Sequence, residues 1–405
     1  MKKNHFWQTA LFAGALLFGF TACSSDDNGA QQQNNGKEQT LTIALNLAQT
    51  STMRTVSTSD PALTTPNESA INDVIVAIFD GSGNTVKIEK VTSSQTSDPV
   101  PGLSGVNKWA NGPKVTVAAQ GLAAGYEVYV VANAPTAAST SLLACTSKTA
   151  FEAVTIDADQ TLSADGTAAG NGKSTNLVML GKGTLAPGGT ATFASTVTVY
   201  RLVSKVYIEN ASANFTGLYA GATYTIKEIY LDNVPDAQAF KLDENTTAPS
   251  VNLNILGTNP ATTTSAKPYL TTGTISEALS TTAAPLNYFF YAMPNANATT
   301  HTRLVVKGDF TIGGNTTEIY YPIYLNWTWD DTNSVWKAVD ETTLLPYATT
   351  TRAAKKIYAN DAYKITLDIK TIGVTDPRQD LDPQSVEVNV TVANWVDIAQ
   401  NSTFQ

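Results

Sequence analysis

Residues 40–47 read TLTIALNL, and this stretch indicates how the chain folds. Single small or polar residues separate its apolar side chains, which belong to Leu41, Ile43, Leu45 and Leu47. Successive side chains of a β-strand point to opposite faces of a sheet, so this alternation predicts a strand with one apolar face. The ordered part of the chain therefore opens with a β-strand.

The same alternation returns near the other end of the chain, where residues 386–395 read VEVNVTVANW. From 386 to 392, every second residue of this stretch is a valine: Val386, Val388, Val390 and Val392. Polar or small residues occupy the positions between them, so one face of this strand is apolar as well. One interpretation is that the strand completes its own domain, as a terminal strand commonly does.

The residues between these two stretches predict an all-β fold. Runs rich in Glu, Lys and Leu are scarce, whereas Thr, Val, Tyr, Ile, Asn and Gly dominate, which is strand and turn composition. Five of the predicted strands are INDVIVAIFDGSGNTV (71–86), YEVYVVANAP (126–135), AFEAVTI (150–156), TVTVYRLVSKVYIEN (196–210) and AYKITLDIKTIG (362–373). A Gly/Ala/Pro stretch at 183–191 separates two such series. We expect two Greek-key β-sandwich domains, at 55–190 and 191–405.

The N-terminus has the features of an export signal. Two lysines precede an almost uncharged apolar run over residues 6–20, and small residues then lead to Cys23. This predicts a signal peptide over residues 1–22, too short for a comfortable membrane span. A cysteine directly after small residues resembles the lipobox of bacterial lipoproteins, which implies a lipid on Cys23, although Phe20 replaces the usual leucine. The alternative is a spare cysteine beside an ordinary cleavage site.

Composition limits the partners of the chain. Its net charge is −9, and an acidic surface repels phosphate backbones, so nucleic acid is not an expected partner. Once Cys23 is lipidated, Cys145 is the only remaining cysteine and cannot form an internal disulfide. We interpret Cys145 as a small buried hydrophobic residue.

No constellation of residues indicates catalysis, a cofactor or a metal. His301 is the only histidine after the signal peptide, and no serine stands in a nucleophile-elbow motif. DPRQDLDP offers Asp376, Asp380 and Asp382 for calcium but lacks the glycine and glutamate of a calcium loop. We therefore expect no catalytic, cofactor-binding or metal-binding residues. One aromatic run is a candidate sugar platform, or else a strand with a buried and an exposed face: Tyr321, Tyr324, Trp327 and Trp329.

Several stretches, in this order, resemble the fimbrillins, the type V pilins of gram-negative anaerobes. They are INDVIVAIFDGSGN, VYVVANA, LVMLGKG, VTVYRLVSKVYIEN, YANDAYKITLDIKTIG and VEVNVTVANW. The most specific is YRLVSKVYI, with Arg201 and Lys205 four residues apart. LVMLGKG departs from the Met-Ser-Gly that the family often carries there. The resemblance covers nearly the whole chain and implies two transthyretin-like β-sandwich domains.

The resemblance also implies how the chain matures. Fimbrillins are surface lipoproteins that an arginine-specific protease trims, after which the subunits polymerise by strand exchange. Arg54 is the only arginine before Arg201, so cleavage between Arg54 and Thr55 would release residues 23–54, a lipid-anchored tether and propeptide strand. Residues 386–392 of another subunit would then replace that strand, as in pilin strand complementation. The alternative role of Arg54 is that of an ordinary loop arginine.

The expected function is therefore a shaft subunit of a surface fimbria that supports adhesion. Its expected partners are copies of itself or related fimbrial subunits, the protease, the outer membrane before cleavage, and a host or bacterial surface receptor. The alternatives are a surface glycan-binding lipoprotein, a fimbrial tip adhesin and a lipid-anchored hydrolase.

Overall fold

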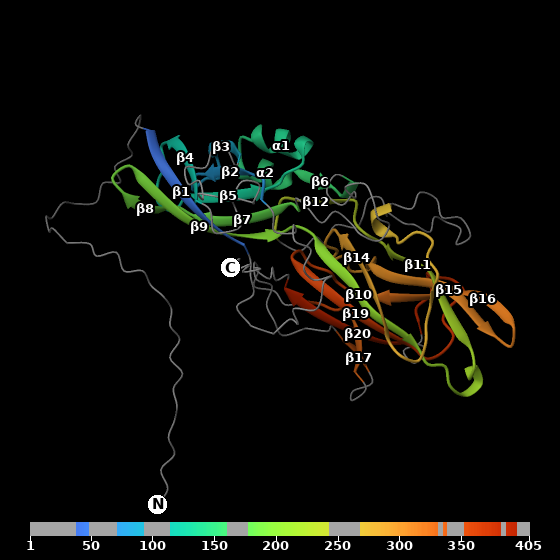
Figure 1. The fold of residues 1–405 in the computed structure, drawn as a ribbon. Coiled ribbons are helices and arrows are strands. Elements are labelled where there is room, and N and C mark those ends of the chain that lie inside the picture. Colours follow the sequence, from blue (N-terminus) through green and yellow to red (C-terminus); the bar gives the residue numbers. More distant parts are fainter. Residues whose placement is uncertain are drawn as a thin grey trace, which may run out of the picture.

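The computed structural model describes residues 38–47, 71–92, 114–159, 177–242, 268–330, 335–337, 352–381 and 386–394. Most of these residues lie in β-strands, which form two large groups joined near the middle of the chain (Figure 1). The predicted all-β class is confirmed. Among the described residues, no helix is both long and apolar enough to cross a membrane.

The first group is one continuous sheet in the order β3-β2-β5-β7-β9-β1-β4, with β8 paired to β9. Its strands are β1 (Glu38–Leu47), β2 (Asp73–Phe79), β3 (Thr85–Thr92), β4 (Lys114–Gln120), β5 (Glu127–Ala132), β7 (Met179–Thr184), β8 (Ala186–Gly189) and β9 (Thr192–Arg201). The end strands β3 and β4 contact each other, so the sheet curls around an inner core.

Strand β2 shows why this sheet has two apolar faces. Val74, Val76 and Ile78 belong to the inner core, whereas the residues between them belong to an outer core on the other face. Two short helices, α1 (Thr136–Leu143) and α2 (Lys148–Ala153), contribute buried residues to that outer core. A strand buried on both faces reads as a continuous apolar run, as DVIVAIF does.

The second group consists of two four-stranded sheets that share one hydrophobic core. One sheet has the order β14 (Ala284–Ala292), β10 (Ser204–Ala213), β19 (Asp361–Ile369) and β20 (Val386–Asn394). The other has the order β13 (Glu277–Ala278), β11 (Thr223–Asp232), β15 (Arg303–Ile312) and β16 (Asn315–Tyr324). This group also contains the short pair β17 (Thr328–Asp330) and β18 (Val335–Lys337) and the 3-10 turns η2 (Gly217–Tyr219) and η3 (Pro268–Leu270).

The transition between the two groups falls at Leu202 and Val203, rather than at the Gly/Ala/Pro stretch that marked it in the sequence. Strand β9 belongs to the first sheet, because residues 183–191 form the end of β7, β8 and a tight turn into β9. The two connecting residues are buried, and Asn360 of the second group hydrogen-bonds to the backbone on both sides of Leu202. Strand β6 (Thr155–Asp157) also pairs with β12 (Ala237–Ala239) across the junction.

Candidate functional site: the position of strand β1

Strand β1 lies inside the first sheet, with a partner along each of its edges. It runs parallel to β9, where Leu41 pairs with Phe193, and antiparallel to β4, where Leu41 pairs with Val117. We call the position between β4 and β9 the β1 slot. Without β1, both neighbours would expose a row of unpaired backbone N–H and C=O groups, which is a template for another strand.

The apolar face of β1 is part of the inner core. Leu41 and Ile43 are 0% exposed and Leu45 is 2% exposed. Burying such a side chain contributes about 1.5–3 kcal/mol, so these three contribute roughly 5–9 kcal/mol as an upper estimate. The side chain of Leu47, which was predicted for the same face, lies outside the described residues. The alternation of the sequence thus identifies three buried residues of the slot.

Gln39 is a residue of the slot that sequence reasoning missed. Its side chain is 4% exposed, and its Oε1 accepts a hydrogen bond from the backbone N–H of Leu122 at 2.6 Å. The period-two pattern extends back by one step from Leu41 to Gln39, so the alternation itself places this polar side chain on the apolar face. The slot therefore has one polar position ahead of its apolar ones.

Two glycines on β7, which pairs with the edge of β9 away from the slot, explain part of the LVMLGKG motif. Strand β7 pairs with β9, and a Cβ atom built on Gly181 would lie 2.3 Å from the backbone oxygen of Thr198. A Cβ on Gly183 would lie 2.7 Å from the Ser195 hydroxyl oxygen. Both positions must lack a side chain because β7 and β9 approach so closely there.

The residues predicted for processing lie outside the described part of the chain. Cys23, Arg54 and Thr55 belong to segments before β1 and between β1 and β2, of which the structure describes nothing. What it does show is the position of Arg54 in the order of elements. A cut after Arg54 would separate β1 from every other strand of its sheet.

The valine-rich stretch forms strand β20 and lies in a different sheet from β1 (Figure 1). It pairs antiparallel with β19 and is the end strand of that sheet, with Val388 opposite Leu367 and Val390 opposite Ile365. In the monomer this strand therefore extends its own second group, as one of the two interpretations expected. An end strand keeps only one backbone partner, so releasing it breaks one ladder rather than two.

The YRLVSKVYI motif lies at the junction between the two groups. Arg201 ends β9, Lys205 follows the start of β10, and both side chains are buried. The Lys205 ammonium lies 4.9 Å from the centroid of the Phe289 ring, a distance at which the ring face attracts a cation. The motif is thus part of the junction and does not contribute to the β1 slot.

The aromatic run proposed as a sugar platform is largely covered. Tyr321 is buried in the core of the second group. The Lys355 ammonium lies 3.3 Å from the centroid of Trp327 and 4.1 Å from that of Tyr324. The side chain of Trp329 lies outside the described residues. Because Lys355 lies against two of these rings, the structure gives no support to a stacked sugar there.

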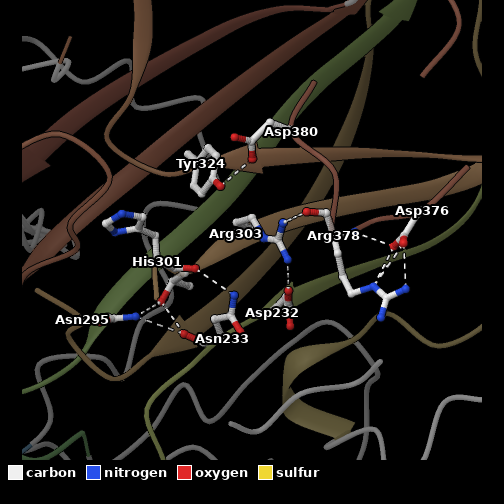
Figure 2. A network of polar contacts seen from close by, with 10 residues as sticks. Asp232, Asn233, Asn295, His301, Arg303, Tyr324, Asp376, Arg378 and Asp380 are labelled. Carbon is white, nitrogen blue, oxygen red and sulfur yellow. Dashed lines mark hydrogen bonds and ion pairs between the residues drawn. The ribbon is translucent and has the colours of Figure 1, made fainter. Parts of the chain in front are cut away.

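The acidic turn near this run binds the protein itself (Figure 2). Asp376 forms a two-pronged ion pair with Arg378, and this lowers the pKa of the Asp376 carboxyl. Asp380 accepts a hydrogen bond of 2.6 Å from the Tyr324 hydroxyl. Asp382 lies outside the described residues. Within the described ranges, no three or more His, Cys, Asp or Glu residues are grouped so that they could hold a metal ion.

Neither His301 nor Cys145 is poised for catalysis. Burial, followed by the charges of Lys355 and Lys356, lowers the pKa of His301, whose ring packs edge-on against Tyr324. Burial also raises the pKa of the Cys145 thiol, which disfavours the reactive thiolate. Its Sγ lies 3.3 Å from the backbone oxygen of Ser141 and donates a weak hydrogen bond to it.

The first strand of the described residues, β1, thus lies inside a β-sheet rather than at its edge. Residues 40–254 match the family model of the major fimbrial subunit protein (FimA). The match covers more than half of the chain and begins within β1. The chain belongs to this family of fimbrial subunits. Comparison with curated proteins gives no match.

Solved structures share the fold at low sequence identity. A candidate cell adhesion protein from Bacteroides eggerthii is similar with a TM-score of 0.57 and 21% identity, over 90% of this chain and 99% of that one. A fimbrilin from Porphyromonas gingivalis is similar with a TM-score of 0.53 and 17% identity, over 89% and 98%. Membership of the family makes the chain a structural component of a cell-surface fimbria that associates with other fimbrial subunits, and not a member of an enzyme class.

Proposed function

We propose that this chain is a shaft subunit that polymerises by exchanging strand β1 for a strand of another subunit. In this proposal the precursor is exported, lipidated on Cys23 and held at the outer membrane with β1 in its slot. An arginine-specific protease then cuts between Arg54 and Thr55. The cut frees β1, and the tail of a second subunit takes its place.

The position of β1 is the observation that carries this proposal. The first strand of the described residues fills an interior position, buries three aliphatic side chains and is joined to the next strand through the segment that holds Arg54. A propeptide strand needs these three properties. It must complete the fold before cleavage, it must leave a slot afterwards, and a single cut must detach it.

The shaft role rests on the same two ends of the chain. A shaft subunit must both receive a strand and give one, and this chain offers the β1 slot and the valine-rich strand β20. An anchor subunit would keep its lipid and would not need the cut at Arg54. In this proposal the protein is at the cell surface first as a lipoprotein and afterwards as part of the fimbria.

Cleavage is tested by changing Arg54 and reading the N-terminus of surface fibres. Wild-type fibres should begin at Thr55, and Arg54→Ala should leave a lipid-tethered monomer with β1 still attached. Arg54→Lys is the matched control, because it keeps the positive charge. An arginine-specific protease should not cleave this variant, whereas a protease that also accepts lysine should. Assembled fibres that still contain Leu41 would contradict the proposal.

A further inference from the structure

The polar position of the β1 slot constrains any strand that replaces β1. The Leu122 N–H that binds Gln39 is buried while β1 fills the slot, and a strand that takes the place of β1 would again exclude water from it. A buried donor without an acceptor costs more free energy than its hydrogen bond contributes. The incoming strand must therefore bring an acceptor to the position two residues before its first buried aliphatic side chain.

One other stretch of this chain has that pattern. Residues 39–47 read QTLTIALNL, and residues 384–392 read QSVEVNVTV. In both, a glutamine is followed by aliphatic residues at the second, fourth, sixth and eighth positions after it. Gln39 and Gln384 are the only glutamines in the 405 residues with this continuation. The second position also matches, with Thr40 exposed in β1 and Ser385 in the tail.

We propose that the tail of a second copy enters the slot in the direction of β1 and in one register, with Gln384 in place of Gln39. Val386, Val388 and Val390 then take the positions of Leu41, Ile43 and Leu45. Gln384 is in this arrangement the residue that sets the register, because its side-chain oxygen accepts the hydrogen bond from Leu122. The inference rests on the strand exchange proposed above and specifies its geometry.

The reversed direction also has a polar residue available, since Asn394 follows Val392 by two positions. Backbone geometry opposes it. The backbone N–H and C=O of a residue in the slot point either toward β9 or toward β4. Which of the two they face depends on the direction of the strand and on whether the side chain of that residue points inward or outward. If the tail entered in the reverse direction with its valines still inward, the N–H and C=O groups of those valines would face the opposite neighbouring strand, β4 in place of β9 or the reverse. Both ladders, to β9 and to β4, would then have to shift by one residue against the buried side chains.

The proposed register also fixes which surfaces of two subunits meet. Leu381 packs against the core of the second group, and Tyr324 holds the neighbouring Asp380. Only two residues separate Leu381 from Gln384, so at most about 11 Å of chain joins them. The 376–381 turn of the donor must then lie beside the Gln39 end of the acceptor's slot, next to Leu122.

Cysteine cross-linking between subunits tests direction and register together. In the slot, Thr40 lies opposite Ala118, which is exposed on β4. Directly opposite residues have Cβ atoms about 4.5–5.5 Å apart, close to disulfide range. In a Cys145→Ser background, Ser385→Cys with Ala118→Cys should give a ladder of covalent multimers when cleaved subunits polymerise and are mildly oxidised. Ala393→Cys with Ala118→Cys, the pair for the reversed strand, should give none.

Each outcome of this experiment decides something different. A ladder from the Ala393 pair, or no ladder from either pair in fibres that do form, would overturn the proposed register and leave strand exchange standing. Failure of cleaved wild-type subunits to form fibres would instead contradict the exchange itself. The uncleaved Ser385→Cys, Ala118→Cys precursor is the control and should stay monomeric, because β1 fills the slot.

The role of Gln384 is tested by polymerisation rates of cleaved subunits. Gln384→Leu should slow polymerisation roughly tenfold, since the Leu122 N–H is then buried without an acceptor. Gln384→Glu retains an acceptor oxygen and should stay closer to the wild-type rate. Gln379→Leu, outside the matched stretch, is the control, and the melting temperature of each monomer checks folding. A wild-type rate for Gln384→Leu would show that this residue does not set the register.

Discussion

Replacing Ile43 by Ala should destabilise the precursor and leave the assembled fibre unchanged. Ile43 is at the centre of β1, fully buried, and pairs with Val115 on β4 and Ser195 on β9. The change removes three carbon atoms, at about 0.8 kcal/mol each, and leaves a cavity whose cost adds to that loss. The free energy of unfolding of the precursor should fall by about 2–5 kcal/mol.

The fibre should not respond, because β1 has left it. A loss of 2–5 kcal/mol corresponds to a decrease of roughly 4–20 °C in the Tm of a domain of this size, which calorimetry of the purified precursor measures. Dissociation of fibres in guanidinium gives the second measurement. Val117→Ala on β4 is the control, since Val117 borders the slot before and after exchange and the substitution should weaken both forms. Fibres that weaken as much as the precursor when Ile43 is changed would refute the reasoning.

Three further predictions address the two ends of the chain. Cys23→Ala should abolish incorporation of a fatty-acid probe, and equal labelling of wild type and variant would contradict the lipoprotein assignment. Val388→Asp combined with Val390→Asp should abolish polymerisation of cleaved subunits because it charges the apolar face of the tail; polymerisation at the wild-type rate would mean that another segment is donated. A synthetic peptide of residues 38–47 should slow polymerisation in a concentration-dependent way, since it competes for the slot, whereas a peptide with Ile43 replaced by Asp should not.

The local pattern of the sequence predicted the strands well, but it could not predict which strands pair with each other in a sheet. Alternation alone identified β1 and its buried residues Leu41, Ile43 and Leu45. The order of strands depends on which distant segments pair, and the partner of β1 in the parallel ladder, β9, begins at Thr192. No residue within β1 indicates that β9 is its parallel partner. The interior position of β1, which the proposed function depends on, therefore came only from the structure.

Residues 136–153 show a second limit of pattern reasoning. The stretch AFEAVTI was predicted to be a strand, but its first half lies in helix α2 and only its end forms β6. Ser147 accepts a hydrogen bond from the Ala150 N–H and caps this helix, a signal that precedes the apolar run. Short apolar runs do not distinguish helix from strand by period. Here the need to cover the outer face of the first sheet decides, since Phe151 packs edge-on against Phe79.

In the proposed strand exchange, the difference in size between the two matched strands explains why cleavage would have to come first. Each buried aliphatic residue of β1 carries one carbon more than the valine that would replace it, so β1 binds the slot better by about 2.4 kcal/mol, roughly fiftyfold, at about 0.8 kcal/mol per CH₂. While β1 is joined to its own sheet, it also competes at an effective concentration near the millimolar range. The tail cannot displace it under these conditions. A cut after Arg54 separates β1 from its sheet, and each tenfold fall in the concentration of β1 at the slot shifts the balance by about 1.4 kcal/mol toward the tail. A fall of about two such tenfold steps offsets the smaller side chains of the tail. Because the donor strand is the weaker of the two, assembly would start with the cut and not with the encounter of two subunits.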